Sequence, residues 1–98
     1  MKPRMPRSVK VGPHSYIIIR KVIRKEDGWC DFQNLQILIQ KRLKRSRAQV
    51  TLVHEILHAC NPNPHEAVQE EEALVTGVAP VLLDVLQINP DLVAYLTN

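Results

Sequence analysis

Aromatic residues are scarce in this chain, which has one tryptophan, two tyrosines and one phenylalanine among its 98 residues. Cysteine is scarce as well, since Cys30 and Cys60 are the only two and neither belongs to a Cys-x-x-Cys pair. The sequence therefore contains no disulfide framework and no four-cysteine zinc site. We expect both thiols to stay reduced, as in a cytoplasmic protein.

Long apolar runs are missing from the N-terminal part of the chain. The start, MKPRMPRSVKVG, is basic, and the first apolar stretch, Tyr16–Ile19, is far too short for a signal sequence or a membrane span. We therefore expect a cytoplasmic protein with no membrane partner. A chain of this length forms one domain with a small core, so a bound metal ion would add to its stability.

Basic residues are absent from the second half of the chain. All 13 lysines and arginines, with three acidic residues, lie in residues 1–47, and the other seven acidic residues lie in 48–98. Two interpretations are open: an anionic partner at the basic end, or two halves that attract each other. The basic stretch 41–47 has no aromatic residue between its charges and no nucleic-acid motif, so we expect a solvated loop and no nucleic-acid partner.

The pattern of apolar and turn-forming residues predicts an α+β domain. We expect a loose basic arm over residues 1–13, where prolines and a glycine interrupt the basic residues. The stretch 15–24 is rich in β-branched residues, and the stretch 29–40 alternates apolar and polar residues near its end. With the turn signal at 26–28 between them, they predict an antiparallel hairpin, whose second strand bends near Gln33-Asn34.

Three helices should follow this hairpin. The first spans 46–60, where a Ser-x-x-Gln capping box opens the helix and an Asn-Pro pair closes it. The second spans 63–87 and should kink over 76–80, because the proline there cannot donate a backbone hydrogen bond. A short last helix spans 89–96.

Residues 54–58 read His-Glu-Ile-Leu-His, the HExxH pattern, within the first predicted helix. Residues four apart share one helix face, so the imidazoles of His54 and His58 can reach one ion. Glu55 lies beside them, placed to act on a metal-bound water as a general base. It carries the only charge on 48–60, as a buried metal helix requires. The alternative, two partly exposed histidines on an amphipathic helix, does not account for that single charge.

Catalytic zinc needs a third protein ligand and an open position for water. A third histidine in the pattern HExxHxxGxxH is excluded, because asparagine and proline occupy the glycine and last histidine positions. The remaining candidates are His65, Glu66 and the acidic run Glu70–Glu72, which leads into an apolar helix. Periodicity alone allows either Glu71 or Glu72 to face the first helix.

With these motifs the chain resembles the gluzincin metallopeptidases, which carry HExxH on one helix and a glutamate ligand on the next. It is most similar to the minimal gluzincins of the proabylysin and projannalysin type and to small phage-encoded ImmA/IrrE-like zinc peptidases. From Glu72 onward the chain reads Val75-Thr76, Val78-Ala79 and Leu82-Leu83, a spacing similar to that of the glutamate helix in the ImmA/IrrE-like peptidases. The resemblance implies a minimal zincin fold, with zinc bound by His54, His58 and Glu72.

The resemblance also implies a function, with Glu55 as the catalytic residue. It implies a zinc peptidase in which Glu55 assists the attack of a zinc-bound water on a peptide bond. A peptide or protein substrate would pair along an edge strand within 29–40. Because so little chain follows the glutamate helix, we expect a shallow cleft and a latent or narrowly selective enzyme. The alternative is a catalytically silent, zinc-stabilised interaction module of a phage or regulatory protein.

Overall fold

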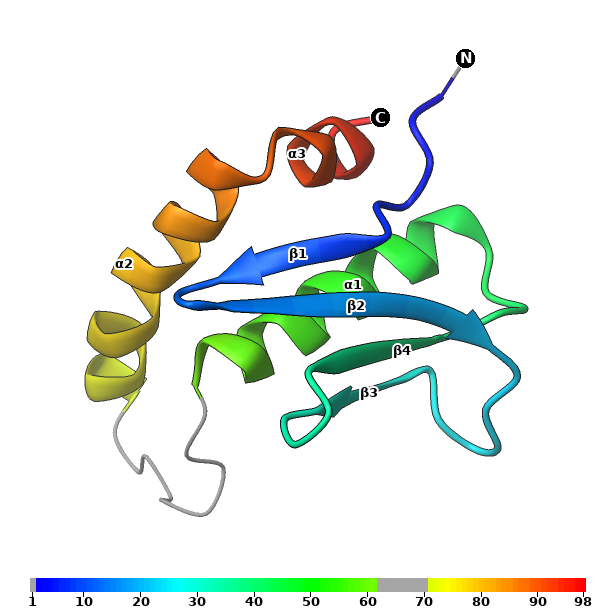
Figure 1. The fold of residues 1–98 in the computed structure, drawn as a ribbon, viewed down its shortest axis with the longest axis horizontal. Coiled ribbons are helices and arrows are strands. Elements are labelled where there is room, and N and C mark those ends of the chain that lie inside the picture. The colour runs from blue at the N-terminus through cyan, green and yellow to red at the C-terminus, as the bar shows by residue number, and fades with distance from the viewer. Residues whose placement is uncertain (1, 62–70) are drawn as a thin grey trace.

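The computed structural model describes residues 2–61 and 71–98, and the side chains of 2–61 and 77–98. In the described residues, four strands form one mixed sheet and three helices pack around it, which confirms the α+β class (Figure 1). The strands are β1 (Ser8–Val11), β2 (His14–Lys21), β3 (Gly28–Asp31) and β4 (Gln36–Gln40). The helices are α1 (Arg45–Cys60), α2 (Glu71–Ile88) and α3 (Pro90–Leu96).

The sheet has the strand order β1-β2-β4-β3, in which β2 and β4 are parallel neighbours. The other two pairs, β1 with β2 and β3 with β4, are antiparallel. The predicted antiparallel hairpin of 15–24 with 29–40 is therefore wrong. The second stretch folds back on itself, because the Asp31 carboxylate accepts hydrogen bonds from the backbone of Gln33 and Asn34 and from the Asn34 side chain. A turn thus replaces the predicted bend.

The predicted loose arm over 1–13 is wrong in part, because Ser8–Val11 forms β1 at one edge of the sheet. Val9 and Val11 are buried in the core, whereas Ser8 and Lys10, which alternate with them along the strand, are exposed. This alternation is too short to stand out among the surrounding prolines and basic residues.

Helix α1 covers one face of the sheet (Figure 1). Its buried residues Ala48, Leu52, Ile56 and Ala59 recur at helical spacing and pack on a core that includes Ile37 and Ile39. The predicted end at Cys60 is confirmed. The predicted capping box is wrong, because the helix begins one residue before Ser46 and its N-cap, Lys44, makes no side-chain cap bond.

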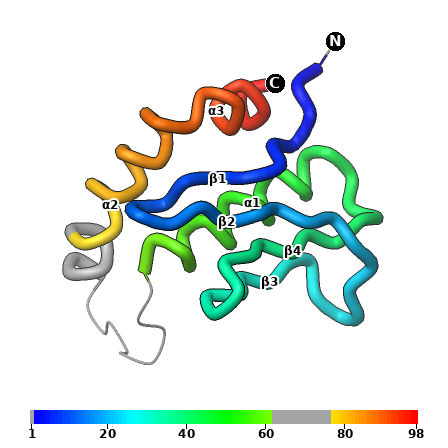
Figure 2. Tube along the Cα trace, viewed as in Figure 1, coloured from blue at the N-terminus to red at the C-terminus, as the bar shows by residue number. Residues whose placement is uncertain are grey.

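Helices α2 and α3 lie along the β1 side of the sheet, and the chain turns sharply between them (Figure 2). α2 continues through Pro80, as predicted for a single helix, and the kink expected over 76–80 stays a prediction. The last helix occurs as predicted. At the corner, the Asn89 side chain accepts a hydrogen bond from the Lys10 amide (3.0 Å) and donates to the carbonyls of Lys10 (3.0 Å) and Val85 (2.7 Å). The predicted start of the second helix, at residue 63, lies outside the described residues.

No single helix in the described part of the chain is both long and apolar enough to cross a membrane. The segments Gly77–Ile88 and Pro90–Leu96 reach that length and composition only as a pair, across a bend of 98°.

Candidate metal centre

Helix α1 brings the two histidines of the HExxH motif together on its exposed side. The Nε2 atoms of His54 and His58 lie 3.1 Å apart, and the two rings meet edge to face with centroids 4.8 Å apart. With Glu55 they form a group whose potential ligand atoms all lie within 4.8 Å of one another. Among the described residues, this is the group of three or more such side chains that can hold a metal ion.

The separation of the two imidazoles fits a shared ion. Nitrogen ligands lie about 2.0–2.1 Å from zinc, so two nitrogens 3.1 Å apart subtend about 100° at the ion, close to the tetrahedral value. Imidazole nitrogen suits zinc and the other late divalent transition metals. The same distance also allows a hydrogen bond between the two Nε2 atoms, with either ring as the donor.

The side chain of Glu55 turns inward from the two histidines and is only 5% exposed. No hydrogen bond or ion pair within the described residues engages its carboxylate. Burial raises the pKa of this carboxyl, and Glu26 adds to the rise, while the charges of His54 and His58 oppose it. Glu55 is therefore a buried carboxylate that has lost part of its hydration and gained no internal partner in the described residues.

Gly28 explains how the carboxylate fits beside the sheet. It is the first residue of β3, the edge strand next to α1, and its lack of a side chain lets strand and helix approach closely. A Cβ atom on Gly28 would lie 2.7 Å from Thr51 Cγ2, 2.9 Å from Glu55 Oε2 and 3.0 Å from the Leu38 carbonyl oxygen. From the sequence, Gly28 is predicted only as part of the turn at 26–28. Its close contact with α1 could have been predicted, because a glycine within a strand often marks a place where another group approaches the backbone.

Two pockets meet at His54. One, of about 450 Å³, lies between the loop before β3 and the first half of α1, and Glu55 contributes to its wall. The other, of about 520 Å³, lies between α1 and α2, where His58 and the apolar side chains of Leu57 and Leu82 line it. The candidate site thus opens on both sides of the histidine pair.

The predicted third ligand remains a prediction. The backbone of Glu72, like that of Glu71, lies in the first turn of α2, but their side chains are outside the described residues. His65, Glu66 and Glu70 are outside them altogether. Helices α1 and α2 pack against each other, so the two parts of the predicted site belong to neighbouring elements.

Comparison with known proteins adds nothing to these residues: no family model, no curated protein and no solved structure matches the chain. The sequence and the structure together show a candidate metal site with the HExxH spacing on an α+β fold.

Proposed function

We propose that this protein is a small zinc-dependent peptidase of the gluzincin type. His54, His58 and Glu72 would hold the ion, and Glu55 would act as the general base. The observation that carries the proposal is a pair of imidazoles 3.1 Å apart beside a buried carboxylate, next to an edge strand of the sheet.

The chemistry assigned to the chain's own residues is proton transfer by Glu55. A bound zinc ion would polarise the scissile carbonyl and make water a better nucleophile at neutral pH. As the water oxygen bonds to the carbonyl carbon, the Glu55 carboxylate takes up the released proton. It then passes that proton to the nitrogen of the leaving amine as the C–N bond breaks. A carboxylate without an internal partner is suited to both steps.

Strand β3 supports the predicted mode of substrate binding. It pairs with β4 on one side and is the last strand of the sheet, so its other side can accept an extended peptide. Gly28 at its start lies against Glu55. A peptide added to β3 would therefore pass close to the proposed base.

The decisive experiment compares bound zinc with hydrolysis in matched variants. We expect one zinc ion per chain, lost in Glu72→Ala and retained in Glu71→Ala and Glu55→Gln. We expect Glu55→Gln to lose at least about a hundredfold in hydrolysis of a peptide library, because the base is removed while the ion stays. Full activity in Glu55→Gln would exclude the peptidase, and equal zinc in both alanine variants would exclude the ligand set.

A zinc-stabilised interaction module is the second candidate. The exposed apolar side chains of Ile17 and Trp29, on the sheet face away from α1, favour it, because such residues often mark contact surfaces. This candidate differs from the first in one outcome, since an interaction module keeps its function in Glu55→Gln.

A further inference from the structure

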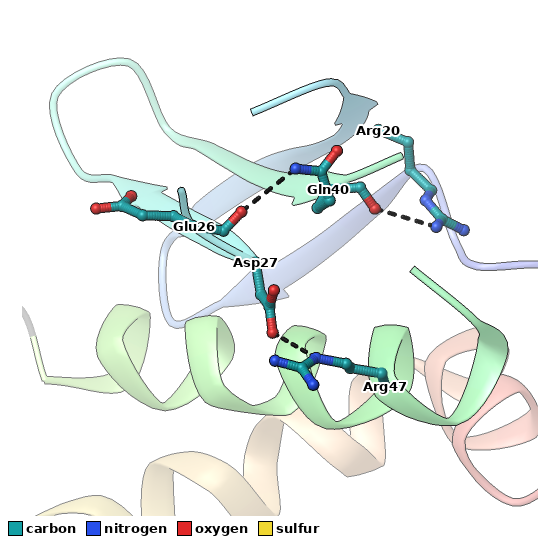
Figure 3. A network of polar contacts seen from close by, with 5 residues as sticks. All are labelled: Arg20, Glu26, Asp27, Gln40 and Arg47. Carbon is teal, nitrogen blue, oxygen red and sulfur yellow. Dashed lines mark hydrogen bonds and ion pairs between the residues drawn. The ribbon is translucent and has the colours of Figure 1, made fainter. Parts of the chain in front are cut away.

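The basic half of the chain concentrates its charge at one end of the sheet. The parallel strands β2 and β4 end side by side there, and the Lys41 amide donates a hydrogen bond to the Lys21 carbonyl (2.9 Å). The Gln40 side chain holds the loop before β3 against this end by donating to the carbonyl of Ile23 and to that of Glu26, the second of which Figure 3 shows. We call this surface the basic end; its exposed cations are Lys21, Arg24, Lys25, Lys41, Arg42 and Lys44.

These cations are not neutralised within the described part of the chain. The single ion pair there joins Arg47 to Asp27 (2.7 Å), both from the basic half (Figure 3). Glu26 is the other acidic residue of the loop, and neither Asp84 nor Asp91 pairs with a lysine or arginine among the described residues. Among the described side chains, the cations of the basic end are therefore available to an anionic partner, whereas the side chains of Glu66 and Glu70–Glu72 lie outside the described residues.

The basic end is continuous with the candidate site. Lys25 and Arg47 line the same 450 Å³ pocket as His54 and Glu55. The loop that carries Arg24 and Lys25 leads directly into β3 at Gly28. An extended chain lying along β3 and past Glu55 would therefore reach the basic end next.

We propose that the basic end binds an acidic segment of the protein substrate, adjacent to the bond that is cut. The assignment to a substrate rests on the proposed peptidase function. Cations grouped on two adjoining loops attract a run of carboxylates, and exposed charges of this kind act in a salt-dependent way. Nucleic acid is less favoured, because residues 20–27 and 41–47 contain no aromatic side chain on which a base could stack.

The test measures binding without turnover, in the Glu55→Gln background, by fluorescence anisotropy of a labelled glutamate-rich peptide at low salt. We expect Lys25→Glu/Lys41→Glu to weaken binding at least about tenfold, because two attractive charges become repulsive. The matched control Lys2→Glu/Lys10→Glu makes the same change of charge on the N-terminal segment and β1, outside residues 21–25 and 41–44, and should change binding less than about twofold. Equal effects of the two double variants would overturn the proposal. An oligonucleotide of the same charge that displaces the peptide at a lower concentration would reassign the surface to nucleic acid.

A second readout tests the link to the site. Backbone amide NMR shifts should change in β3 as well as in the basic end when the peptide carries an extended apolar segment next to its glutamates. Unchanged β3 amides would overturn the assignment to a substrate. Neither measurement needs zinc or hydrolysis, so failure here is distinguishable from failure of the proposed peptidase, which zinc content and Glu55→Gln activity decide separately.

Discussion

The Glu55 carboxylate lies against Gly28, so closely that a Cβ atom on this glycine would be 2.9 Å from Oε2. Gly28→Ala should therefore displace the carboxylate, because the opposing Leu38 carbonyl belongs to the backbone and cannot move aside cheaply. We expect the free energy of unfolding to fall by about 1–3 kcal/mol, the usual cost of overpacking. Hydrolysis should fall further than the loss of folded protein explains, while bound zinc is retained.

Gly77→Ala is the matched control for that variant. A Cβ atom on Gly77 meets nothing within 4 Å, and the residue lies inside α2. The substitution should raise the free energy of unfolding by about 0.5–1 kcal/mol, since alanine favours a helix over glycine. If both alanine variants change the free energy of unfolding alike in urea denaturation, overpacking at Gly28 is not the cause of the change.

Metal binding should appear as stability that a chelator removes. Zinc at 100 times its dissociation constant adds about 2.7 kcal/mol to the folded state. We expect a chelator to lower the melting temperature of the wild-type chain but to have no effect on His54→Ala or His58→Ala. His14→Ala, an exposed histidine on β2, should respond like wild type. A chelator-insensitive wild-type chain would show that the two histidines hold no structural ion.

Cys30 should make the protein less stable in alkali. Burial raises the pKa of its thiol to about 12, and the nearby Glu55 and Asp31 carboxylates add to the rise. The unfolded chain releases this proton near the ordinary thiol pKa, so stability is fully present below about pH 8.5 and falls as the pH rises toward 12. The slope approaches about 1.4 kcal/mol per pH unit for one group.

Urea denaturation between pH 7 and pH 10.5 measures this slope. Cys30→Ala should flatten it, although burial also raises the pKa of Cys60 and Tyr16, which leave a smaller slope of the same sign. An unchanged slope in Cys30→Ala would show that the Cys30 thiol is not the main titrating group.

Asn89→Ala should loosen the corner between α2 and α3. Its side chain makes three hydrogen bonds, and at about 0.5–1.5 kcal/mol each the free energy of unfolding should fall by about 1.5–4.5 kcal/mol. The control is Asn98→Ala, which removes a single hydrogen bond, from Asn98 Nδ2 to the Ala94 carbonyl (2.7 Å). It should lower the free energy of unfolding by less than about 1 kcal/mol. If α2 carries the third ligand, Asn89→Ala should also weaken zinc binding, as competition with a colorimetric chelator would show.

The histidine pair could be predicted from the sequence because its geometry is local. Residues four apart on a helix face the same way wherever the helix lies, so His54 and His58 needed no knowledge of the sheet. The end of α1 and the position of α3 could likewise be predicted from local sequence signals, because an Asn-Pro pair occurs at 61–62 and again at 89–90.

The strand pairing could not be predicted in the same way. Whether β4 lies beside β2 in parallel or opposite it depends on contacts between distant segments, which turn residues do not encode. The role of Gly28 was hidden for the same reason, since its close neighbours Leu38, Thr51 and Glu55 are remote in sequence. The third ligand could not be chosen from the sequence either, because it depends on how α2 faces α1. The periodicity of α2 alone allows both Glu71 and Glu72.

The Asn89 side chain restricts where a second strand can pair with the sheet. The Asn89 side-chain amide hydrogen-bonds both the N–H and the C=O of Lys10, which point outward from the middle of β1. A strand from a second molecule cannot pair there without displacing it, so β1 is a protected edge. The sheet then offers β3 alone for strand addition among the described strands. One chain can dock, but copies cannot continue the sheet from both sides into a fibre.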